Sequence, residues 1–349
     1  VRASGRLRTL ALAAGLLAGA SACSGGAAAP SAPPSTRRAA VSSPATATPA
    51  QPAPAVTRAE AGEVFSTLTA TDDVLRAAAP ALRDGPLRDA KVHLTRDAES
   101  LLVAAAYQST AFHPPRYDWG SPVLYVPRFP AGWESPWFTA LVPRDGHPTL
   151  LTFAKVGKDA KWQISAMTRL LDGQDPPPVQ LDAEGYATAL DPGDKSVTIS
   201  PQYMGPLHAT VAEAGATGVT SGLIAPGPYT TALAEEISED REQAKTSGLS
   251  YDSIFSGNDY PVYALRTRDG GALIQYSLSR NTTTTTRTAE KDFMPVPDSA
   301  QWAIDAKVVR RTLKLTETHQ YAATVPPVST PSAARVIAHE GALTGASGE

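Results

Sequence analysis

Near the start of the folded region, hydrophobic residues are spaced as in a helix. Further along the chain they occupy alternate positions, as in a strand. Within residues 60–81, Phe65, Leu68 and Leu75 share one helical face, and the pattern is interrupted near Thr71. We therefore predict one broken helix or two helices here. Short extended runs follow, which predict strands at residues 123–129, 137–142, 150–156 and 162–170.

The last of these runs shows the clearest alternation. Trp162, Ile164 and Leu170 lie on one face, whereas Lys161 and Arg169 lie on the other. This period is typical of a half-buried antiparallel strand. A hairpin turn is predicted at residues 145–146, where Asp is followed by Gly.

The pattern restarts after residues 175–178, an Asp followed by three prolines that no helix or central strand could include. We place a domain boundary between residues 175 and 176. Beyond it, Ser200 and Pro201 are typical of a helix start, and Gly215 of its end. A second helix is predicted from Pro228 to Gly248, and strands at residues 262–268, 272–278, 306–324 and 335–338.

The order of elements predicts an α+β fold with two units, at residues 58–175 and 176–349. In each unit, helices precede a curved antiparallel sheet. In order and spacing, this resembles the cystatin-like cone of nuclear-transport-factor type. The resemblance implies cone-shaped domains, which often enclose a cavity.

The N-terminus predicts export. Residues 1–22 contain three arginines, an apolar run and small residues directly before Cys23, which is the layout of a secretory signal peptide. The apolar run is shorter than the roughly 20 residues that a membrane-spanning helix needs. The end of the segment resembles the lipobox of bacterial lipoproteins, although Ala20 stands where that motif usually has Leu. The resemblance implies a lipid on Cys23; an ordinary cleavage site with a free thiol is the alternative.

Residues 23–57 predict a lipid-anchored linker. They consist almost entirely of Ala, Pro, Ser, Thr and Gly, which favours a disordered stalk reaching on the order of 100 Å. We thus expect an extracytoplasmic protein, anchored by its lipid to the outer face of the cytoplasmic membrane. The whole layout resembles secreted actinobacterial lipoproteins with domains of unknown function. That resemblance implies an envelope location and supplies no activity or catalytic residues to transfer.

Composition narrows the function. The net charge is −3, and removing the three arginines of residues 1–22 makes it more negative, which argues against a nucleic-acid partner. With one cysteine, the chain can form neither an intramolecular disulfide nor a thiolate metal cluster. The 31 prolines and 26 glycines argue against a helical bundle.

The six histidines lack the paired spacing of a zinc hydrolase, so we predict no metal site and no cofactor. His208 is expected to be a partly buried core residue. His319, beside Glu317 and Tyr321 on a predicted strand, is the best acid–base candidate. The folded region has neither a phosphate-binding loop nor a nucleophile elbow, so no catalytic residues are assigned.

Aromatic residues concentrate in residues 112–138. There, Trp119, Trp133 and Trp137 are candidate ligand-binding residues, because aromatic side chains on loops stack on sugars or anchor protein partners. Core packing with prolines at strand edges is the alternative. The threonine tract at residues 282–286 is expected to be a solvated loop.

These observations favour a non-catalytic binding or scaffolding module displayed outside the membrane. Its partner would be an envelope protein or a cell-wall glycan. Two alternatives stay open: an enzyme using a cone-shaped pocket, and a solute-binding lipoprotein, for which repeated βαβ units would be expected.

Overall fold

The computed structural model describes residues 53–81, 94–157, 159–218, 220–257, 260–287 and 293–349. Residues 51–349 belong to one compact unit. Within the described ranges there are four α-helices: α1 (Arg58–Ala78), α3 (Asp97–Ser109), α4 (Met204–Ala214) and α5 (Thr231–Thr246). The predicted signal peptide, Cys23 and nearly all of the predicted stalk lie outside the described residues.

The strands confirm the predicted α+β class. Among the described residues, nine form one open sheet, in which every neighbouring pair is antiparallel and the order is β1-β2-β3-β4-β11-β10-β7-β5, with β6 also paired to β7. Their bounds are β1 Val123–Tyr125, β2 Trp137–Arg144, β3 His147–Ala154, β4 Gln163–Leu170, β5 Leu249–Ser256, β6 Tyr263–Arg266, β7 Ala272–Thr286, β10 Thr312–Val325 and β11 Arg335–Gly348. A separate pair consists of β8 (Met294–Pro295) and β9 (Val308–Val309).

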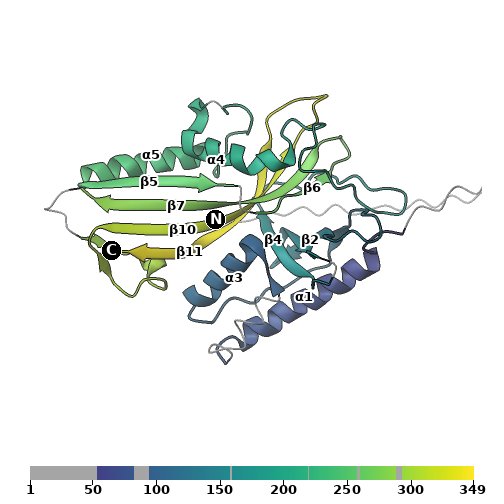
Figure 1. Cartoon of the computed structure of the whole chain (residues 1–349), viewed down its shortest axis with the longest axis horizontal. Helices are drawn as coiled ribbons and strands as arrows, with labels where there is room; N and C mark the ends of the chain where they lie inside the picture. Colours follow the sequence, from purple (N-terminus) through teal and green to yellow (C-terminus); the bar gives the residue numbers. More distant parts are fainter. Residues whose placement is uncertain (1–52, 82–93, 158, 219, 258–259, 288–292) are drawn as a thin grey trace, which may run out of the picture. The chain divides into compact units, whose positions relative to one another are not determined.

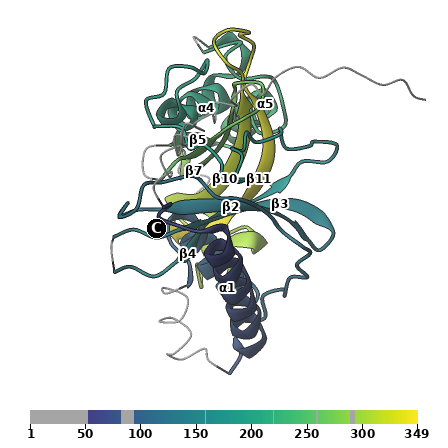
Figure 2. The same ribbon diagram turned by 90° about the vertical axis from the view of Figure 1, so that its right-hand side faces the viewer.

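Strands β4 and β11 join the two halves of the sheet through a short contact. Their register pairs Leu170 with Ala338 and Arg169 with His339. Figure 2 shows β2 and β3 running across the direction of β10 and β11. The sheet thus continues past the predicted boundary at residues 175–176, and the division into two cystatin-like domains stays a prediction.

Helices cover the second half of the sheet from opposite sides. Figure 1 shows α4 and α5 on one side of the long strands and α3 on the other. Successive residues of a strand point to opposite faces. Accordingly, His339 lies near Tyr229 in the segment before α5, whereas Glu340 contacts Arg144 near α3.

Two large apolar clusters form the core. One lies beneath α4 and α5 and includes Met204, Ile237 and Tyr321. The other joins α1 to β2 and β3, where Phe138 stacks on Phe153 with ring centroids 4.7 Å apart. Burying side chains of this size stabilises the fold by roughly 1.5–3 kcal/mol each.

Helix α1 is continuous, so the predicted interruption near Thr71 is wrong. The Thr71 hydroxyl donates to the carbonyl of Thr67 at 2.7 Å, and Asp72 pairs with Arg76 one turn later at 2.6 Å. These local bonds keep the polar residues within the helix. Helix α3 was not predicted, because its sequence shows no clear polar stripe.

Strand β4 is covered on both faces, which corrects the prediction of a half-buried strand. The Ser165 hydroxyl donates to Asp97 of α3 at 2.6 Å, while Thr168 accepts a hydrogen bond from Gln275 of β7 at 3.4 Å. Ser165 and Thr168 therefore face partners within the protein instead of water.

The threonine tract is also a strand, so the predicted solvated loop is wrong. Residues 282–286 extend β7 and pair with β5 on one side and β10 on the other. β-branched threonine suits a paired strand. Strand β5 was not predicted, and β11 runs well past the predicted residues 335–338. No helix among the described residues is long and apolar enough to cross a membrane.

Candidate functional site

The three tryptophans singled out from the sequence lie in different surroundings. Trp119 packs edge-on against Phe65 and Tyr117, with centroid distances of 6.4 and 5.7 Å. Trp137 is half-buried beside Tyr263 at 5.2 Å. Trp133 is 51% exposed, and it alone of these three lines a hollow among those described below. Ligand binding by the three residues stays a prediction.

Trp133 lines a hollow of about 360 Å³ together with Trp162. A second hollow of about 340 Å³ shares Glu60 and Trp162 with the first and continues along α1. We call the two together the tryptophan groove. Its further side chains are Glu63, Val64, Thr67, Leu68, Glu134, Pro136, Lys155 and Lys161, and Ala55, Val56, Gly132 and Gly157 complete it.

Hydrogen bonds and an aromatic contact fix the segments that form the groove. The Thr57 side chain caps α1 by accepting a hydrogen bond from the Glu60 amide at 3.1 Å. Just before it, the Ala55 amide donates to the carbonyl of Phe129 at 2.9 Å. Trp133 lies in a turn and stacks on Phe129, with ring planes 9° apart. The N-terminus of α1 and the loop that carries Phe129 and Trp133 therefore fix one end of the groove.

The groove combines aromatic faces with charges of both signs. Carboxylates accept hydrogen bonds, ammonium groups donate them, and indoles offer large rigid faces. Sequence reasoning missed Trp162, because its place in the alternating pattern of the strand was taken as a core position. It packs edge-on against Phe138 at 5.4 Å yet also lines the groove.

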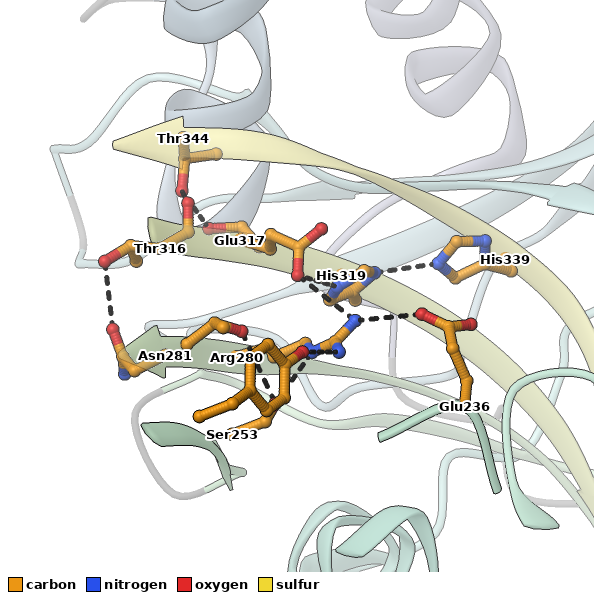
Figure 3. Close-up of polar contacts among 12 residues, drawn as sticks. Glu236, Ser253, Arg280, Asn281, Thr316, Glu317, His319, His339 and Thr344 are labelled. Atoms are coloured by element: carbon orange, nitrogen blue, oxygen red, sulfur yellow. Dashed lines mark hydrogen bonds and ion pairs between the residues drawn. The ribbon is translucent and has the colours of Figure 1, made fainter. Parts of the chain in front are cut away.

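A second polar cluster lies on the α4–α5 side of the sheet (Figure 3). His319 Nδ1 and His339 Nε2 are 3.0 Å apart, so one of them donates to the other. Glu317 lies between His319 at 3.9 Å and Arg280 at 3.4 Å. The Arg280 guanidinium also reaches Glu236 of α5 at 4.0 Å.

Gly341 allows the two histidines to approach each other. A Cβ atom at this position would collide with His319 Nδ1 and would lie 2.9 Å from His339 Nε2. Only a residue without a side chain therefore fits opposite His319 on β11.

His208 is a core residue, as predicted, but it is fully buried instead of partly buried, and both of its ring nitrogens are bonded. Nε2 lies 2.6 Å from the carbonyl of Tyr229 and must donate to it, so Nδ1 accepts from the Tyr276 hydroxyl at 3.0 Å. Burial lowers the pKa of His208 to about 4. It stays neutral at physiological pH as a structural residue.

His339 and Glu317, the ionisable neighbours of His319, are poorly suited to acid–base work. Burial, with the neighbouring His319 and His208, lowers the pKa of His339 to about 3. Burial of Glu317 opposes ionisation, but its contacts with His319 and Arg280 prevail and lower its pKa. A general base works best with a pKa near the operating pH. The cluster around the predicted acid–base candidate His319 is therefore better described as a hydrogen-bonded array.

Within the part of the chain that the structure describes, no group of three or more His, Cys, Asp or Glu residues could hold a metal ion.

The family model of a domain of unknown function, DUF8094, matches residues 52–348. The chain is 31% identical to the uncharacterized lipoprotein SCO6871 of Streptomyces coelicolor, over 87% of this chain and 86% of that protein. An uncharacterized lipoprotein of Streptomyces avermitilis is 28% identical over 41% of this chain and 42% of its own length. No solved structure matches. The chain therefore belongs to the DUF8094 family.

Proposed function

We propose that this protein is a membrane-tethered binding module of the cell envelope that takes a cell-wall glycan in the tryptophan groove. Residues 1–22 act as a signal peptide, Cys23 carries a diacylglyceryl anchor, and residues 23–52 form the stalk, since Ala55, Val56 and Thr57 belong to the folded part. Lipoprotein relatives in Streptomyces support the tether. Two acyl chains give a stable anchor where one would bind only marginally.

The observation that carries the proposal is that Trp133 and Trp162 both line one groove, together with charged residues of both signs. Sugar rings present C–H faces that stack on an indole, and hydroxyl groups that both donate and accept hydrogen bonds. Glu60, Glu134 and Lys155 supply acceptors and donors beside the indoles. A groove that mixes apolar faces with a few polar groups is the usual form of a small-ligand site.

Binding to purified cell-wall sacculi tests the proposal. The mature chain from Ser24, without lipid, is mixed with sacculi at physiological salt and sedimented. We expect wild-type protein in the pellet and at least tenfold weaker retention of Trp133→Ala, since truncating a tryptophan hot spot typically costs about 2 kcal/mol or more.

Tyr203→Ala is the matched control, because Tyr203 is 55% exposed and does not line the groove. Equal retention of the wild type and Trp133→Ala would reject the groove as the site. Retention only in the presence of another envelope protein would point to a protein partner instead.

The tether has its own test. We expect the intact mass of membrane-fraction protein to include a diacylglyceryl group, and a Cys23→Ala chain from the same host to lack it and to be released or unprocessed. An identical unlipidated mass for both proteins would contradict the anchor.

A further inference from the structure

A small cavity lies beneath α3, away from the tryptophan groove. Its volume is about 90 Å³. Glu99 of α3, only 2% exposed, and Arg144 of β2, 8% exposed, contribute its buried charged groups. The other lining residues are Arg76, Leu102, Val103, Ala106, Tyr117, Met167, Glu340, Gly341 and Ala342.

Two buried groups in this cavity have incomplete hydrogen bonding. Glu99 Oε2 has no hydrogen-bond partner among the described residues. Arg144 pairs with Glu340 through Nη2 at 2.5 Å, but its Nη1 donates to the sulfur of Met167 at 2.8 Å. A thioether is a weak acceptor, and an unmet buried polar group typically costs about 1–3 kcal/mol. Both groups would gain from a ligand with oxygen atoms.

The charges facing Glu99 come from three elements. Arg76 of α1 is paired with Asp72 at 2.6 Å, Arg144 of β2 is paired with Glu340 of β11, and the Tyr117 ring lies within 4.2 and 4.8 Å of the two guanidinium groups.

Burial, together with the negative charge of nearby Glu340, raises the pKa of Glu99 to about 8. At neutral pH its carboxyl group is therefore mostly protonated and can donate a hydrogen bond.

A larger cleft adjoins the cavity. It has a volume of about 430 Å³ and shares Arg144, Glu340 and Gly341 with the cavity. On the far side of Gly341 its walls include Tyr229 and His339, whose rings stack 3.8 Å apart. Arg169 adds a further positive charge there.

We propose that the cavity binds the carboxylate group of a small organic acid, with the rest of that molecule lying in the adjoining cleft. One carboxylate oxygen of the ligand accepts a hydrogen bond from the protonated carboxyl group of Glu99. The other accepts a hydrogen bond from Arg144 Nη1, in place of the sulfur of Met167. The cavity has the volume of about three water molecules, which suits the three heavy atoms of a carboxylate. Arginine pairs with carboxylates through geometrically matched donors.

Calorimetric titration of the mature chain from Ser24 tests this site. The probes are acetate, N-acetylalanine and benzoate, with N-acetylalaninamide as the uncharged match and inorganic phosphate as a second oxyanion. We expect at least one carboxylate to bind at about pH 6.5 and to bind tenfold or more weakly at about pH 9.5, where Glu99 is ionised. The amide and phosphate should bind at least tenfold more weakly than that carboxylate.

Three variants make the result specific. Glu99→Gln keeps a donor that does not titrate, so carboxylate binding should persist and lose this pH dependence. Glu99→Ala should reduce binding at least tenfold at pH 6.5. Glu239→Gln, an exposed position of α5, should behave as wild type.

Binding of none of the three carboxylates, equal binding of the amide, or an unchanged pH profile in Glu99→Gln would overturn the proposal and leave a water-filled cavity. Tighter binding of phosphate than of every carboxylate would do the same. The residues of this site are separate from those of the tryptophan groove, so glycan binding and carboxylate binding can fail independently.

Discussion

His208 and Glu99 are both fully buried ionisable side chains, on helices that cover opposite sides of the same sheet. Both are neutral at physiological pH because burial opposes their charge. They differ in their partners. Both ring nitrogens of His208 are bonded within the protein, whereas Glu99 keeps an oxygen with no partner in the described part of the chain.

The difference shows how buried polar residues divide into structural and functional candidates. A satisfied group such as His208 specifies how α4 packs on the sheet, and it has nothing left to offer a ligand. An unsatisfied group such as Glu99 reduces stability, and its oxygen is left to form a hydrogen bond with a ligand. Burial alone, or a shifted pKa alone, does not separate the two cases.

The largest expected effect is the pH dependence of Glu99→Gln. The unfolded chain loses the Glu99 proton near pH 4.5, whereas the folded chain keeps it up to about pH 8. The wild type should therefore lose stability as pH rises through this window, and the variant should not.

The free energy of unfolding of Glu99→Gln relative to wild type should rise by roughly 4 kcal/mol from pH 4.5 to 8, because each pKa unit is worth about 1.4 kcal/mol. Urea unfolding across this range measures it, with Glu239→Gln as the control. A flat difference would mean that Glu99 is not a buried acid.

The opposite behaviour is expected of His208→Ala. Losing the imidazole leaves a cavity and two unpaired groups, the Tyr229 carbonyl and the Tyr276 hydroxyl, so the variant should lose about 3 kcal/mol at neutral pH. The exposed residue His113 supplies the control, His113→Ala.

The stability lost in His208→Ala should become smaller as pH falls from about 6.5 towards 4. In this range histidine in the unfolded chain binds a proton, whereas buried His208 in the folded wild type stays neutral, so the wild type itself loses stability. Urea unfolding at several pH values measures the trend. Equal stabilities of His208→Ala and wild type would show that the pairing of His208 contributes nothing.

Gly341 lies between the two regions of the comparison, and Gly341→Ala should destabilise the fold by about 2 kcal/mol. Its Cβ would collide with the histidine pair, and overpacking of this kind typically costs 1–3 kcal/mol. Gly345 on the same strand has room, since its nearest neighbour would be 3.8 Å away. Thermal unfolding should therefore leave Gly345→Ala close to wild type. Similar melting temperatures for both variants would contradict the close approach of His319 and His339.

The smallest expected effect is the difference in stability between phenylalanine variants of two tyrosines near His208. Tyr276→Phe removes the hydroxyl that donates to His208 and should cost about 1 kcal/mol. The buried Tyr321 hydroxyl has no partner among the described residues, so Tyr321→Phe should be neutral or slightly stabilising. Chemical unfolding of both variants measures the contrast, and a reversed order would break the account of the His208 network.

Local pattern predicted much of the fold. Ser200 and Pro201 precede the first turn of the segment that becomes α4, and Gly215, with φ of +66°, ends it. The hairpin at residues 145–146 and the strand at residues 272–278, which is the first part of β7, were also predicted correctly. In these places, neighbouring residues determine the structure.

The errors arose where distant partners decide the outcome. The threonines of residues 282–286 are polar, yet strands on both sides pair with them. Likewise, Glu99, Arg144 and Glu340 are far apart in the sequence and meet only because α3 packs beside β11. No local signal marks such a site. Trp133 could be proposed from the sequence, whereas its neighbour Trp162 needed the structure.

Nuclear magnetic resonance of the indole N–H groups tests glycan binding most directly. The chain has five tryptophans, and each gives its own indole signal. On adding soluble cell-wall glycan fragments to the mature chain from Ser24, we expect the signals of Trp133 and Trp162 to shift, and those of Trp119, Trp137 and Trp302 to stay in place. Unmoved signals, or shifts confined to the latter three, would contradict the tryptophan groove as the binding site.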